Sequence, residues 1–240
     1  EIADPSTVSA VDNSEASATL TFQTYLNAAK KYVAIHPDDF YEPLIDVGAV
    51  PVANQNIKGT IFQSGGRFTD VDYLIVTTDL LRSQAERLAQ HNQTYRGLNV
   101  KVVTLDEIYN EFSSGKQDIG AIRNLVRYVY ENASSSENRL KYLCLFGDTS
   151  FDYKDRISNN NNIVPTFNTY YSFSQSQSYM SDDYFGSLDP EEGVIENNSP
   201  AGSGGSDRLD IAVGRILADT PMLAKTAVDK IISYDERASF

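Results

Sequence analysis

Apolar residues gather into short, nearly continuous runs over the second two thirds of the chain. The clearest runs are 71–77, 100–103 and 140–146, and a fourth, 209–213, follows a long irregular stretch. Runs without polar alternation are typical of strands that are buried on both faces of a sheet. We therefore predict four strands, with the first three in the interior of the sheet.

Between these runs, apolar residues recur at helical spacing. After the first strand, Thr78 or Asp79 can cap a helix that ends before Gly97, a residue suited to the position after a helix. Asp106 is predicted to cap a short helix that ends near Gly115. Each helix places the next strand parallel to the last one.

Two more helices complete this pattern. Asp118 is predicted to cap a helix before the third strand, and Thr220 and Pro221 open the last helix, with proline at its first position. Together these elements predict a doubly wound α/β fold, with a mainly parallel four-stranded sheet, flanking helices and a short preceding β segment.

The first part of the chain has a different pattern. Residues 19–23 alternate as a strand does, 31–35 form a second short strand candidate, and prolines and glycines then interrupt the pattern repeatedly. We predict that residues 1–66 are the end of an upstream β domain with its linker, and that 67–240 are the α/β unit. The first residues lack the basic and apolar stretches of a signal peptide, so we expect a piece of a longer protein.

Composition excludes several classes of function. The net charge of −13 argues against nucleic-acid binding, which needs clustered Lys and Arg. No apolar run approaches the length of a membrane span. The single cysteine excludes an internal disulfide framework and a cysteine-rich zinc site.

Nucleophilic catalysis would need a thiol or hydroxyl with a base in reach. Cys144 lies in the middle of the third apolar run, where a thiol packs as a small hydrophobic group. His91 falls inside the first predicted helix, and His36 lies in the upstream segment. We expect no Cys–His pair in this chain.

Residues 147–208 form a long connection, rich in Asn, Ser, Gly and Tyr, after a strand's carboxyl end. Ligands of open α/β sheets bind at that edge, although the stretch also fits a surface elaboration. Its acidic clusters give the candidate Ca²⁺ ligands Asp148, Asp152, Asp182 and Asp183. The alternative role of these aspartates is in caps, turns and pairs with arginine.

A series of ordered motifs resembles a known family. They include KYLCLFGD at 141–148, SDDYFG at 181–186 and DIAVGRI at 210–216. The remaining motifs are 72–77, 84–89, 97–103, 108–115 and 118–123. The chain is similar to the gingipain family of cysteine peptidases, with a caspase-like fold, and is closest to its sortase branch in type IX secretion.

The resemblance implies a secreted cysteine endopeptidase with two side-by-side α/β sub-domains, of which this chain is the first. The catalytic His and Cys of the family belong to the second sub-domain, so no catalytic residue is carried over and this chain is expected to be inactive. The implied partners are the remaining catalytic sub-domain and protein or peptide substrates. The implied location is the extracellular or outer-membrane surface of a Bacteroidetes-type bacterium, and the family's calcium binding favours the Asp clusters.

A different class of function remains open. Tyrosines on the long connection could stack on sugars, which would make the chain a non-catalytic adhesion or carbohydrate-binding module. They are Tyr170, Tyr171, Tyr179 and Tyr184.

Overall fold

The computed structural model describes residues 54–169, 173–175, 178–189, 192 and 209–237. The chain divides into two compact units, Glu1–Val52 and Ala53–Phe240, and every described residue belongs to the second. The strands predicted for the upstream segment therefore lie outside the described residues.

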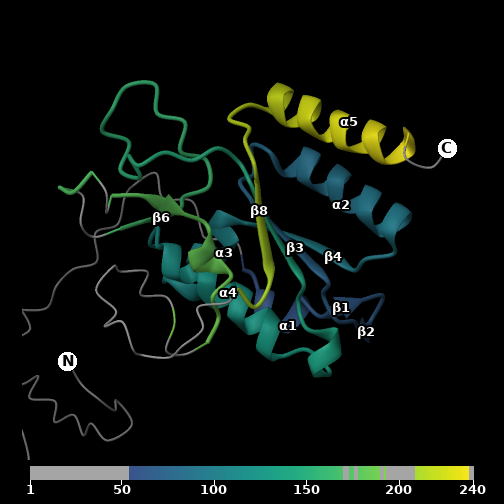
Figure 1. Ribbon diagram of the computed structural model, residues 1–240. Helices are drawn as coiled ribbons and strands as arrows, with labels where there is room; N and C mark the ends of the chain where they lie inside the picture. Colours follow the sequence, from purple (N-terminus) through teal and green to yellow (C-terminus); the bar gives the residue numbers. More distant parts are fainter. Residues whose placement is uncertain (1–53, 170–172, 176–177, 190–191, 193–208, 238–240) are drawn as a thin grey trace, which may run out of the picture. The chain divides into compact units, whose positions relative to one another are not determined.

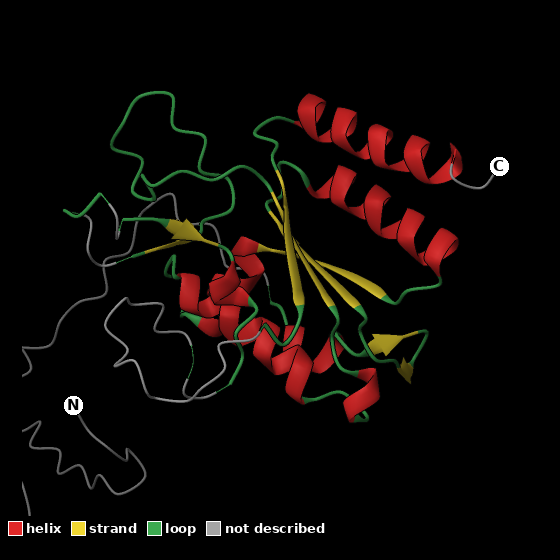
Figure 2. Cartoon of the chain, viewed as in Figure 1, coloured by secondary structure: helices red, strands yellow, loops and turns green. Residues whose placement is uncertain are grey.

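Helices and strands alternate along the second unit (Figures 1 and 2). In chain order they are α1 (Ile57–Thr60), β1 (Gln63–Ser64), β2 (Arg67–Phe68), β3 (Tyr73–Thr77), α2 (Arg82–Arg96), β4 (Val100–Thr104), α3 (Leu105–Phe112), α4 (Ile119–Glu131), η3 (Ser136–Asn138), β5 (Tyr142–Phe146), β6 (Phe167–Asn168), β7 (Met180–Ser181), η4 (Asp183–Phe185), β8 (Ala212–Ile216) and α5 (Pro221–Arg237). No helix in this described part of the chain is long and apolar enough to cross a membrane.

The main sheet has four parallel strands in the order β4-β3-β5-β8. The chain moves outward from β3 to β4, then returns past β3 to β5 and β8, so the winding direction reverses between β3 and β5. This confirms the predicted doubly wound α/β fold. It also corrects one expectation, because β4 lies at an edge of the sheet and only β3 and β5 are interior.

Each face of the sheet carries its own apolar layer, because alternate side chains of a strand point to opposite faces. On one face, Ile75 and Phe146 pack with residues of α2 and α5, including Val228. On the other face, Leu74 packs with residues of α3 and α4, including Ile122. Figure 2 shows α2 and α5 side by side on one side of the sheet.

Several predicted helix ends are confirmed. Gly97 follows α2 with a φ of 67°, the left-handed conformation that glycine adopts without strain. The side chain of Asp118 accepts a hydrogen bond from the backbone N–H of Gly120 at the start of α4. Pro221 is the first residue of α5.

Two helix starts differ from the prediction. Neither Thr78 nor Asp79 is the cap of α2, whose preceding residue is Leu81, without a side-chain cap. Helix α3 begins before Asp106, through a capping box between Thr104 and Glu107. A capping box satisfies two backbone N–H groups at once, which explains why it sets the start.

The fourth strand begins three residues later than predicted, at Ala212. The residue Asp210, which precedes this strand, forms hydrogen bonds to the loop at Gly186 and Leu188 instead. The backbone N–H of Asp210 donates to Gly186, and its carboxylate accepts from the N–H of Leu188 at 2.8 Å. Gly214 and Arg215, which ended the apolar run in the sequence, pair with β5.

Residues 54–66 are held against helices of the α/β unit. The Glu111 carboxylate of α3 accepts hydrogen bonds from the N–H groups of Ile57 at 2.6 Å and Lys58 at 2.8 Å. The hydroxyl of Tyr128 in α4 donates to the carbonyl of Lys58. The boundary at residue 66 stays a prediction.

The strand order predicts a graded pattern of hydrogen exchange. Amides of β3 and β5 should exchange slowest, because both strands are paired on two sides, whereas β4 and β8 should contain alternating fast amides. Exchange measured by NMR on the 240-residue chain checks this. Fast exchange throughout 73–76 or 143–146 would remove that strand from the sheet interior.

Candidate functional site

The long connection leaves the sheet at the carboxyl end of β5, beside the point where the winding reverses. Gly147 has a φ of 155°, and a Cβ there would lie 2.7 Å from the Ile163 side chain. The carbonyl of Asp148 accepts hydrogen bonds from the N–H groups of Ile163 and Val164. Glycine therefore lets the returning chain pass directly over the end of β5.

Internal hydrogen bonds fold residues 148–163 into a defined loop. The Asp148 carboxylate accepts from the N–H of Thr149 at 2.8 Å and from the side-chain amide of Asn161. One oxygen of Asp152, a buried residue, accepts from the N–H groups of Arg156 at 2.6 Å and Ile157 at 2.7 Å. Both aspartates therefore act as turn formers.

Asp182 forms a buried ion pair with Arg215 of β8. Nε and Nη2 of Arg215 donate to the two carboxylate oxygens at 2.8 Å and 2.7 Å. The hydroxyl of Thr166 donates to the same carboxylate at 2.7 Å. The Arg215 side chain is 8% exposed, so this bidentate pair is largely shielded from water.

The same guanidinium also binds the backbone of the long connection. Nη1 donates to the carbonyls of Gly147 at 2.9 Å and Val164 at 2.7 Å, and Nη2 donates to Pro165 at 3.3 Å. Arg215 thus joins the ends of β5 and β8 to two parts of the connection.

A second arginine fastens the far part of the connection. Nε of Arg123 in α4 donates to the carbonyl of Ser187 at 2.8 Å, and Nη2 donates to the carbonyls of Asp189 and Glu192 at 3.1 Å each. Neither arginine was singled out as functional from the sequence. A cation next to an apolar strand, as at Arg215, is a signal for a buried pair, but the sequence does not say with which residue.

The four candidate calcium ligands are not gathered into one site. Asp148 and Asp152 accept hydrogen bonds from their own loop, Asp182 pairs with Arg215, and Asp183 opens η4. The described ranges contain no group of three or more His, Cys, Asp or Glu side chains that could hold a metal ion. This arrangement favours the turn-forming role, and calcium binding stays a prediction.

Cys144 and His91 lie in separate environments. Burial raises the pKa of the Cys144 thiol to about 12, and the neighbouring polar group is the hydroxyl of Tyr73. Nε2 of His91 lies 2.9 Å from a carboxylate oxygen of Asp235, and its ring stacks on Tyr95. His36 lies outside the described residues.

The tyrosines that could stack on sugars in the carbohydrate-binding alternative lie in different environments. Tyr184 is packed down, with its ring stacked on Phe167 at 5.0 Å and the Arg123 guanidinium 5.7 Å from its centroid. Tyr179 is exposed, and Tyr170 and Tyr171 lie outside the described residues. The contacts of Tyr184 are those of a residue that packs a loop onto the fold.

These features define a doubly wound α/β unit that fixes a long connection at its carboxyl edge and keeps its thiol inside the sheet. The sequence model of peptidase family C25 matches residues 67–240. The chain belongs to peptidase family C25, as the gingipain-like motifs indicated. A search among curated proteins gave no match.

Two solved structures are similar to the chain. The crystal structure of dimeric latent PorU from Porphyromonas gingivalis is 31% identical, with a TM-score of 0.54, over 70% of this chain and 16% of that chain. The complex of the Porphyromonas gingivalis RgpB pro- and mature domains is 18% identical, with a TM-score of 0.43, over 68% of this chain and 28% of that chain. The chain thus spans a minor part of the length of both relatives.

The ion pair at the carboxyl edge predicts a large effect of mutation. Arg215→Met should destabilise the chain by about 3–5 kcal/mol, because it leaves the Asp182 carboxylate and several carbonyls without their cation. Arg87→Met is the matched control, since it removes an ion pair with Asp229 between partly exposed side chains and should cost far less stability. Urea denaturation of both variants measures the difference, and equal losses would contradict the role of Arg215.

Calcium binding is tested by thermal denaturation in excess Ca²⁺ and in a chelator. Binding at Asp148, Asp152, Asp182 or Asp183 would raise the midpoint in Ca²⁺, because a ligand of the native state stabilises it. The observed hydrogen bonds favour an unchanged midpoint at millimolar Ca²⁺. A rise that disappears in Asp148→Asn would assign a calcium site to the loop.

Proposed function

We propose that the chain is the scaffold sub-domain of a gingipain-like cysteine endopeptidase with a sortase-like role in type IX secretion. The catalytic Cys and His would lie in a second sub-domain of the same polypeptide, which is the partner of this chain. The whole protein would act on protein or peptide substrates at the extracellular or outer-membrane surface of a Bacteroidetes-type bacterium. Membership of family C25 and the 31% identity to PorU support this proposal.

One observation carries the scaffold role, namely the environment of Cys144. A thiol needs a depressed pKa and an adjacent base to act as a nucleophile. With its pKa raised to about 12, the Cys144 side chain is protonated at pH 7. The Nε2 atom of His91 is engaged with the carboxylate of Asp235 instead.

The scaffold would act through the shape of its carboxyl edge. Arg215 and Arg123 hold the long connection by hydrogen bonds to six backbone carbonyls and one carboxylate. Loops that are fixed in this way lose little conformational entropy when a partner or substrate docks. This edge is therefore a suitable wall for a substrate groove completed by the second sub-domain. The packed ring of Tyr184 gives no support to the sugar-binding alternative.

We expect the 240-residue chain to hydrolyse no peptides and to resist labelling by thiol-directed peptidase inhibitors at neutral pH. Buried thiols react slowly because both access and the thiolate fraction are small. Peptidase assays and mass spectrometry of the inhibitor-treated chain measure this, with Cys144→Ala as the control. Turnover that Cys144→Ala abolishes would contradict the scaffold role.

The location of the catalytic pair is tested on the coding sequence past Phe240. A Gly-His-Gly motif and a later Cys within about one further domain length would support the peptidase. A longer polypeptide should then cleave peptides, and replacing that later Cys should abolish cleavage while Cys144→Ala leaves it intact.

A further inference from the structure

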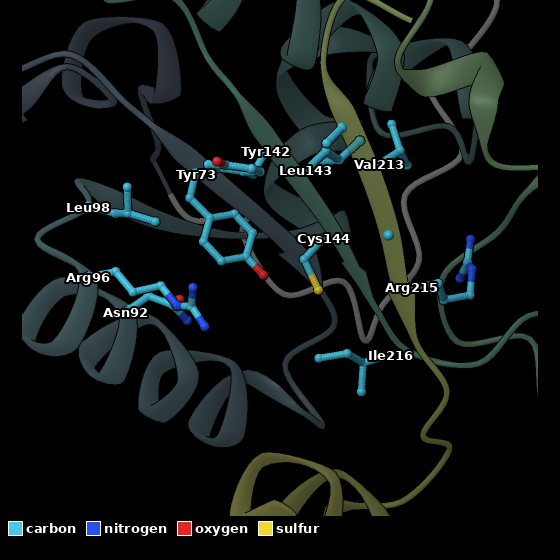
Figure 3. Close-up of a pocket in the computed structure, with 12 residues that line it drawn as sticks. Tyr73, Asn92, Arg96, Leu98, Tyr142, Leu143, Cys144, Val213, Arg215 and Ile216 are labelled. Atoms are coloured by element: carbon cyan, nitrogen blue, oxygen red, sulfur yellow. The ribbon is translucent and has the colours of Figure 1, made fainter. Parts of the chain in front are cut away.

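The face of the sheet that carries α2 and α5 has an open groove that runs along β8 and reaches the last turn of α2. The groove has a volume of about 570 Å³, within the range of small-molecule sites. Figure 3 shows Tyr73 and Cys144 at its floor, with Arg96 and Asn92 of α2 at one end.

Small residues of β8 leave this groove open. Ala212 and Gly214 line it, and a Cβ at Gly214 would meet nothing within 4 Å. The neighbouring strands instead carry large side chains at this level, including Tyr73 and Tyr142, whose rings make an edge contact at 6.1 Å. The groove is therefore apolar along β5 and β8.

One end of the groove carries a cation. The Arg96 side chain is 50% exposed, and its Nη2 donates to the Asp235 carboxylate at 2.8 Å. In the described part of the chain, its remaining N–H groups have no further hydrogen bond to protein. The Tyr73 hydroxyl lies near this end (Figure 3) and is hydrogen-bonded to the Cys144 thiol. A guanidinium with unused N–H donors beside an apolar floor is complementary to a carboxylate on an apolar group.

We propose that this groove binds an apolar group that bears a carboxylate. The carboxylate accepts hydrogen bonds from the unused N–H groups of Arg96, while the apolar part lies along Tyr142 and Gly214. The chain carries a net charge of −13, so an anion gains no general attraction from the protein and must be bound by these specific donors. A fatty acid and the carboxyl terminus of a peptide share this chemistry. The proposal is independent of the peptidase activity.

The test compares acids with their uncharged amides on the 240-residue chain. Octanoate and octanamide represent the fatty acid, and N-acetyl-phenylalanine with its amide represents the peptide terminus. Titrations followed by the NMR signals of Gly214 and Tyr73 should show at least one acid binding about tenfold or more tightly than its amide, because charge-assisted hydrogen bonds are the stronger ones. The acid that binds identifies the source.

Two variants localise the binding. Arg96→Gln should lower the affinity of the acid to that of the amide. Gly214→Leu should abolish binding of both by filling the groove, and it should leave the denaturation midpoint unchanged because the added atoms have free space. Arg87→Gln is the matched control, since it breaks another ion pair between α2 and α5, outside the groove, and should leave the affinity unchanged.

Three results would overturn the proposal. Equal affinity for acid and amide would remove the role of Arg96, and unchanged binding in Gly214→Leu would place the ligand elsewhere. If no carboxylate binds but Gly214→Leu converts a dimeric chain into a monomer in sedimentation, the groove is an interface between copies.

Discussion

The guanidinium of Arg215 has five N–H donors, and all five are used. Two bind the Asp182 carboxylate, and three bind the carbonyls of Gly147, Val164 and Pro165. A buried cation is tolerated only when its charge is neutralised and its donors are satisfied. The positions of β8, the end of β5 and the long connection are therefore linked through one side chain.

The two faces of the sheet are completed in different ways. On the α3 and α4 side, arginines bind the long connection, which adds Val164 and Phe185 to the apolar layer. On the other side, α5 is held to α2 by Asp235, which accepts from His91 and Arg96. The His91 hydrogen bond and the Arg96 guanidinium hold the pKa of Asp235 below its usual value. Polar contacts thus hold the long connection and α5 in place, while apolar side chains fill the space between these elements and the sheet.

Local sequence signals were sufficient for most of the fold and insufficient for the site. The apolar runs located β3 and β5, and Gly97 and Asp118 marked helix ends, because each signal acts within a few residues. The start of β8 was predicted too early because Asp210 accepts a hydrogen bond from the N–H of Leu188, which is 22 residues away in the sequence. The pair of Arg215 and Asp182 spans 33 residues and depends on the order of the strands, so no local pattern identifies it.

The carboxyl edge of the sheet and the groove along β8 differ in how far their hydrogen-bonding groups are already used. At the carboxyl end, Asp148, Asp152 and Asp182 already accept bonds from nearby donors, so a ligand there would have to displace internal partners. That edge is suited to present a fixed shape. In the groove along β8, the Arg96 guanidinium has unused N–H donors and Gly214 leaves free space, so a ligand binds Arg96 there without displacing the bond of Arg96 to Asp235. A small molecule can bind to this fold where unused hydrogen-bond donors lie beside unfilled volume. The location of the carboxyl ends of the strands does not by itself determine that place.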